Sequence, residues 1–214
     1  MVTFGFSAFL KLLYLNDRPQ RTEVKRRLGP PSRGGYDFHK SLRLLARRRL
    51  AGGEPLASVT AAAESIKRLP ERQSAIAGLE RLEAWRAAAP GEIVDVAPAL
   101  FESPRQLFRV RFEPAFGLRH GDRTTAVHIW NTKRPRLAPG PTYAALALTQ
   151  DAYDGQQHGP DDVGVLSLRD PVSAYLLGDG RSPRALAASL IERIEDLILG
   201  SSTPPPSPEE RPTP

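Results

Sequence analysis

The sequence predicts an α/β (α+β) protein, in which a helical, basic first half is followed by a small mixed β-sheet flanked by helices. Apolar residues recur at helical spacing through the first ninety residues, then in alternating or continuous runs between residues 106 and 177. Of the 214 residues, 40% are hydrophobic, and a chain of this length can bury roughly 70% of its unfolded surface. Cysteine is absent, which excludes a disulfide scaffold, a thiol nucleophile and a cysteine-ligated metal centre.

Breaks in the pattern divide the chain into three parts. Pro90 and Gly91 end the last helical run of the first half, and the final fourteen residues read SSTPPPSPEERPTP. A segment so rich in proline and so poor in apolar side chains is typical of a disordered tail. We therefore expect a helical basic region at 1–90, an α/β region with a β-hairpin core at 91–200, and a disordered Pro-rich tail at 201–214.

Five helices are expected in the first half. Residues 4–15 are expected to form a buried first helix rather than a signal peptide or membrane anchor, because the run is short and is interrupted by Ser7 and Lys11. Asp17 and Pro19 suit the start of the second helix. Glycine and proline punctuate the rest, so the second to fifth helices are expected to end at Gly29, Gly52, Pro70 and Pro90.

The second half combines strands with two helices. Residues 106–113 and 124–131 alternate between faces and are separated by turn-forming residues, so we expect them to pair as an antiparallel hairpin. An apolar helix should follow at 142–152, then short strands at 163–168 and 174–177. Ser182 and Pro183 open a last amphipathic helix that ends at Gly200.

Positive charge is concentrated in the first half of the chain. The formal net charge is +6, with 30 Lys and Arg against 24 Asp and Glu. Residues 1–90 hold 17 of the basic residues against 8 acidic ones, whereas residues 91–214 hold 13 against 16. Arginine outnumbers lysine by 25 to 5, which reflects in part the base composition of a GC-rich bacterial genome. The asymmetry nevertheless indicates contact with a polyanion.

The basic excess is densest between residues 18 and 49, where eleven Lys and Arg accompany only Glu23 and Asp37. If the second and third helices display these cations on a common side, they can replace condensed counterions on DNA or RNA phosphates. The alternative is a solvated helical face whose cations complement the helix dipoles. The expected phosphate-contacting residues are Arg21, Lys25, Arg26, Arg43, Arg47 and Arg48.

The order of elements in the second half carries a family resemblance. A strand ending at Glu113, a next strand ending at Asn131 and Lys133, an apolar helix and a further strand resemble the PD-(D/E)XK nuclease-like core over residues 106–168. In that family, clustered carboxylates hold magnesium and a lysine positions the attacking water. The resemblance implies a catalytic set of Glu113, Asp122 and Lys133. Because an amide, Asn131, stands where the family has its second acidic residue, the site is expected to be degenerate.

Other chemistries find little support in the sequence. The four histidines show no metal-binding spacing, and no phosphate-binding glycine loop or nucleophile elbow is present. We expect no cofactor and no metal, apart from magnesium under the nuclease reading. Cytoplasmic location and no membrane contact are also expected.

The leading hypothesis is a non-enzymatic nucleic-acid-binding or assembly subunit that contacts DNA or RNA phosphates through a basic helical surface. The first alternative is a Mg-dependent nuclease of the PD-(D/E)XK type. The second is a structural subunit whose basic surface meets an acidic protein.

Overall fold

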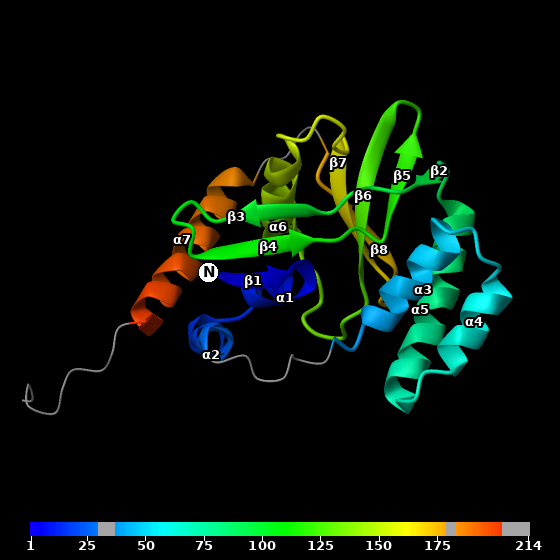
Figure 1. The fold of residues 1–214 in the computed structure, drawn as a ribbon, viewed down its shortest axis with the longest axis horizontal. Helices are drawn as coiled ribbons and strands as arrows, with labels where there is room; N and C mark the ends of the chain where they lie inside the picture. The colour runs from blue at the N-terminus through cyan, green and yellow to red at the C-terminus, as the bar shows by residue number, and fades with distance from the viewer. Residues whose placement is uncertain (30–36, 179–182, 203–214) are drawn as a thin grey trace, which may run out of the picture.

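The computed structural model describes residues 1–29, 37–178 and 183–202, and the fold is drawn in Figure 1. The helices in these residues are α1 (Phe6–Leu13), α2 (Asp17–Leu28), α3 (Lys40–Leu50), α4 (Leu56–Glu64), α5 (Leu69–Ala88), α6 (Pro139–Tyr153) and α7 (Arg184–Ser202). The strands are β1 (Val2–Gly5), β2 (Glu92–Val94), β3 (Ala99–Glu102), β4 (Phe108–Phe112), β5 (Phe116–His120), β6 (Arg123–Trp130), β7 (Asp162–Ser167) and β8 (Ser173–Leu176).

These strands form two mixed sheets. One sheet has three strands in the order β1-β4-β3, and the other has five in the order β2-β5-β6-β7-β8. The β1–β4 and β6–β7 pairs are parallel, whereas the other neighbours are antiparallel. The predicted α+β class, with a helical first half and a mixed sheet flanked by helices, is confirmed.

Strand β6 runs through the centre of the larger sheet, and both of its faces are covered. Ala126 and Trp130 point into a core shared with the smaller sheet, α1, α6 and α7. Val127 and Ile129 point into a second core formed with α3, α4 and α5, which pack side by side in Figure 1. The alternation of the sequence therefore separates two hydrophobic cores. His128 lies on the same side of β6 as Ala126 and Trp130.

The predicted hairpin between residues 106–113 and 124–131 is wrong. Strand β4 pairs with β1 and β3 in the smaller sheet, and the antiparallel partner of β6 is β5. Strand β5 contains Gly117, a residue type that is common in turns, and the sequence therefore predicted a turn here. In the structure a Cβ at Gly117 would lie 2.5 Å from a side-chain carbon of Val96 and 2.7 Å from one of Val94. This glycine therefore makes room for a neighbouring chain within a strand.

The expectation of a helix from residue 4 onward also needs correction. Residues Val2–Gly5 form β1, and α1 begins only at Phe6. Phe4 of β1 packs into the same core as Phe108 of β4 and Ala126 of β6, so this core contains residues from both sides of residue 90. At the other end of the chain, α7 includes residues 201 and 202, and the remainder of the predicted tail lies outside the described residues.

Candidate nucleic-acid interface

The six cations predicted to contact phosphate do not line one common cavity. Four of them form ion pairs, which are Arg26 with Glu23 at 2.7 Å, Arg43 with Asp37, Arg47 with Asp95 at 2.7 Å and Arg48 with Glu54 at 2.7 Å. Glu23 and Asp37 belong to the segment 18–49, whereas Glu54 and Asp95 lie outside it, so part of the opposing negative charge comes from beyond the segment. Among the described residues, Arg26 and Arg43 line the same cavity.

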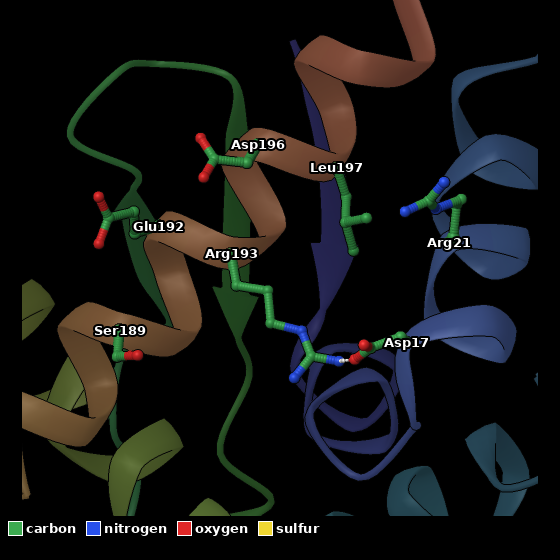
Figure 2. A pocket seen from close by; sticks show the side chains of 7 residues that line it. All are labelled: Asp17, Arg21, Ser189, Glu192, Arg193, Asp196 and Leu197. Carbon is green, nitrogen blue, oxygen red and sulfur yellow. Dashed lines mark hydrogen bonds and ion pairs between the residues drawn. The ribbon is translucent and has the colours of Figure 1, made fainter.

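Arg21 faces a different environment, the gap between α2 and α7 (Figure 2). This cavity has a volume of about 440 Å³ and contains more acidic than basic side chains. Its charged lining residues are Asp17, Arg21, Glu192, Arg193 and Asp196. Arg193 is held by an ion pair to Asp17. Acidic surroundings of this kind disfavour a phosphate at Arg21.

Lys25 stands alone among the six predicted cations. It is exposed on α2 and has no ion pair with any residue that the structure describes. It lines neither the cavity beside Arg21 nor the two cavities around Phe38 and His39. Lys25 can therefore contribute to the electrostatic field around α2, without belonging to a formed site.

A cleft of about 480 Å³ gathers cations from four elements, and we call it the basic cleft. It lies between the start of α1, the end of α2, the start of α3 and the end of β4. Its cationic lining residues are Lys11, Arg26, Arg27, Arg43 and Arg111, and its carboxylates are Asp37 and Glu113. The side chain of Lys11 has no ion pair within the described residues. Concave surfaces lined by one sign of charge focus the field and attract counter-charged ligands.

The position of Arg27 in the cleft is fixed by two contacts. Its Nε donates a hydrogen bond to Glu23 at 2.9 Å, and its guanidinium carbon lies 5.2 Å from the centroid of the Phe4 ring. The second contact is a cation–π interaction with a side chain of β1. Strand β1 thus contributes, through Phe4, to holding Arg27 in the basic cleft.

His128 forms the floor of the cleft together with Ser7. Its Nε2 lies 2.7 Å from Ser7 Oγ, and its Nδ1 lies 3.3 Å from the backbone oxygen of Glu113. The Glu113 carbonyl requires a donor, so Nδ1 carries the proton and Nε2 accepts from the Ser7 hydroxyl. Burial, helped by the positive charge of Arg43, lowers the pKa of His128 to about 3. The ring is therefore neutral near pH 7, and the cost of charging it makes it a poor general base for Ser7.

His39, at the entrance to α3, separates the basic cleft from a second cavity. Its ring lines both cavities, beside Phe38. Burial, helped by the positive charge of Arg43, lowers the pKa of His39 to about 4, so this ring is also neutral near pH 7. The positive charge of the cleft therefore comes from lysine and arginine alone.

The second cavity has a volume of about 490 Å³, and we call it the Asn131 cavity. It contains two residues of the predicted nuclease motif, Asn131 and Lys133, whereas Glu113 lies in the basic cleft. The two cavities share Phe38 and His39 in their linings and so adjoin each other.

Asp122 lies far from the other members of the predicted catalytic set. It occupies the turn between β5 and β6, at the opposite end of β6 from Asn131. Nine residue steps of extended chain, at about 3.3 Å each, place it roughly 30 Å from Asn131. The structure does not bring Asp122 together with Glu113 and Lys133.

The arrangement does not fit the magnesium site that the PD-(D/E)XK resemblance implies. A hard cation needs several oxygen ligands at about 2.0–2.6 Å. With Asp122 remote and an amide at Asn131, Glu113 is the one carboxylate of the predicted set near the motif. Within residues 1–29, 37–178 and 183–202, no group of three or more His, Asp or Glu side chains is placed to hold a metal ion.

Comparisons with known proteins name no family for this chain. No family model matches the sequence, and no curated protein matches it. Among solved structures, a chain titled "Crystal structure of SSO0001" aligns with 10% identity and a TM-score of 0.36, over 90% of this chain and 86% of that one. Among the described helices, none is both long and apolar enough to cross a bilayer.

The sequence alone did not point to three of the cleft cations, Lys11, Arg27 and Arg111. They come from α1, α2 and β4. Strand β4 is distant in sequence from the two helices and meets them because β1 pairs with β4. The sequence around these residues gives little indication of a binding role. Lys11 is a single charge within an apolar helix, and Arg111 is one of the polar residues that alternate with apolar ones along a strand. Only the tertiary structure places these three side chains around one cavity.

Proposed function

We propose that the protein binds DNA or RNA without cleaving it, by seating backbone phosphates in the basic cleft. The observation that carries this proposal is the convergence of Lys11, Arg26, Arg27, Arg43 and Arg111 on one cleft, which has two carboxylates, Asp37 and Glu113, among its described lining residues. Guanidinium groups suit phosphate because their planar donors match two phosphate oxygens at once. Binding at such a site releases condensed counterions and so depends on salt.

Removing two cleft cations should weaken binding. We expect the double variant Lys11→Ala/Arg111→Ala to lose roughly 5- to 30-fold in affinity for a single-stranded oligonucleotide, at about 1–2 kcal/mol for the two contacts. The slope of log affinity against log salt concentration should fall by about 1.4, because each lost phosphate contact accounts for about 0.7 on single strands. Fluorescence anisotropy over a salt series measures both quantities.

The matched control is Arg47→Ala/Arg48→Ala. It removes the same charge from the surface that the sequence predicted, but both side chains lie outside the basic cleft, in ion pairs with Asp95 and Glu54. We expect its affinity to fall less than about 3-fold, which is the scale of a screened long-range effect. An equal loss in both double variants would overturn the assignment to the cleft. Absence of binding at low salt by the unmodified protein would overturn the function itself.

Glu113 separates non-enzymatic binding from nuclease activity. Its carboxylate lines the basic cleft, 3.5 Å from Arg111, and repels a bound phosphate. For a binding protein, Glu113→Gln should tighten oligonucleotide binding about 3- to 5-fold, because a like charge worth about 1 kcal/mol is removed. For a nuclease, the unmodified protein would cleave plasmid or RNA in Mg²⁺ or Mn²⁺ and the variant would not. The two readings thus predict opposite consequences of one substitution, measured by anisotropy and by gel.

A further inference from the structure

The Asn131 cavity differs from the basic cleft in having a buried polar wall. Asn131 follows β6 and is only 2% exposed. Its Nδ2 donates to the backbone oxygen of Ser74 at 3.2 Å and lies 3.1 Å from Ser74 Oγ. The backbone carbonyl accepts hydrogen bonds only, so the amide orientation is fixed with Nδ2 toward α5 and Oδ1 away from that carbonyl.

Asn131 Oδ1 is left as an acceptor without a donor. It is buried and has no hydrogen-bond partner in the structure, and the residue that bears it lines the cavity. Nδ1 of the neighbouring His39 is likewise buried without a partner. Buried polar atoms of native proteins are almost always paired, and leaving one unpaired costs about 1–3 kcal/mol. The cavity is therefore suited to a guest that carries an N–H or O–H donor.

The positive charge of the cavity indicates which charge a bound ligand should carry. Its charged lining residues are Arg81, Lys133 and Arg169, with no carboxylate among the described lining residues. The guanidinium of Arg81 donates a hydrogen bond to the backbone oxygen of Leu168 at 3.3 Å, which orients the side chain. Lys133 and Arg169 make no ion pair within the part of the chain that the structure describes. The guest should therefore carry negative charge as well as a donor.

An aromatic pair completes the cavity at its border with the basic cleft. The rings of Phe38 and His39 lie 4.9 Å apart between centroids, at an interplanar angle of 81°. Aromatic faces stack on nucleobases, and each such contact is worth about 1–3 kcal/mol. A volume of about 490 Å³ lies within the roughly 300–1,000 Å³ typical of small-ligand pockets.

We propose that the Asn131 cavity holds one unpaired nucleotide of the nucleic acid whose backbone occupies the basic cleft. The base donates an N–H to Asn131 Oδ1 and lies against Phe38, and its phosphate contacts Lys133 and Arg169. In a duplex the Watson–Crick donors of the base are already paired, so this site takes single strands or unpaired ends. The inference rests on the nucleic-acid binding proposed above and names its substrate class.

The experiment compares single-stranded and duplex affinity in variants of the cavity. We expect Lys133→Ala/Arg169→Ala to lose about 10-fold in affinity for a labelled single strand of about 12 nucleotides, yet to keep its affinity for the matching duplex within about 2-fold. Phe38→Ala, which leaves every charge in place, should reproduce the preferential loss on the single strand. The matched control Arg134→Ala/Arg136→Ala removes two nearby exposed charges that do not line the cavity, and should change neither affinity by more than about 2-fold.

A strand with abasic sites tests for the base itself. The unmodified protein should bind it about as weakly as the Lys133→Ala/Arg169→Ala variant binds the normal strand. Equal losses on single strand and duplex, or undiminished binding of the abasic strand, would overturn the nucleotide site while leaving the basic cleft intact. A mononucleotide such as AMP that binds more tightly than the strand would also overturn it, in favour of a free nucleotide. If the unmodified protein binds none of these ligands, the proposed function fails first.

Discussion

Phe4→Ala is expected to destabilise the protein by about 3–5 kcal/mol, the cost of truncating a fully buried phenylalanine. Phe4 of β1 is 0% exposed, and its ring lies 5.8 Å from that of Phe108 and 6.4 Å from that of Phe9. The substitution leaves a void between β1, α1 and β4 that rigid strands cannot close. Urea unfolding followed by circular dichroism measures the loss.

The control for Phe4→Ala is Thr3→Ala. Thr3 is the neighbouring residue of the same strand and is exposed, so its truncation should cost less than about 1 kcal/mol. Phe4→Ala should also weaken oligonucleotide binding in protein that remains folded, because the ring of Phe4 supports Arg27 in the basic cleft. A cost of less than about 1 kcal/mol at Phe4 would show that β1 is not part of the cooperative fold.

Acid is expected to destabilise the protein through protonation of His128, at pH values above those at which carboxylates take up protons. The pKa of His128 is about 3 in the folded chain and about 6.5 in the unfolded chain, so the unfolded state binds more protons between these values. The stabilisation is complete above pH 6.5 and is lost as the pH falls, at up to about 1.4 kcal/mol per pH unit. Between pH 6.5 and 5, His128 alone should account for about 2 kcal/mol of the unfolding free energy. His39, with a folded pKa of about 4, adds to the same slope.

The variant His128→Gln isolates this contribution. Glutamine cannot take up a proton, so the slope of unfolding free energy against pH should fall by up to one proton equivalent between pH 6.5 and 5. A slope that is the same in His128→Gln and in the unmodified protein would contradict the burial-induced pKa shift.

Much of the local structure followed from periodicity. The two faces of β6, with Ala126 and Trp130 opposite Val127 and Ile129, were predicted correctly because alternation reports burial on each side of a strand. The pairing of strands was predicted wrongly: the segment that contains Gly117 was interpreted as a turn, whereas it forms β5, the antiparallel partner of β6. Strand β1 has only four residues and runs directly into α1, so its pattern merges with that of the helix.

The basic surface illustrates a different limit of sequence analysis. Between residues 18 and 49 the sequence shows too few acids to neutralise the cations, yet Arg47 meets Asp95, and Arg49 pairs with Glu83 at 2.8 Å. Ion pairs over such sequence distances depend on the packing of α3 against α5 and on the placement of Asp95 just after β2, which composition cannot report. Lys11 and Arg111 come together through a different contact, the pairing of β1 with β4, which composition cannot report either. Of the five cleft cations, Arg26 and Arg43 are among those predicted from the sequence, whereas Lys11, Arg27 and Arg111 are not.

The parallel pairing of β1 with β4 has a consequence for how the chain acquires its binding surface. Val2 lies opposite Phe108, so this pair closes a loop of about one hundred residues. Helices α3, α4 and α5 follow one another in sequence and contact each other, so they can associate from local contacts during synthesis. The N-terminal strand must instead wait until β4 has left the ribosome. We therefore expect the cleft beneath α1 to be among the last features to form, and nascent chains shorter than about 110 residues to lack it.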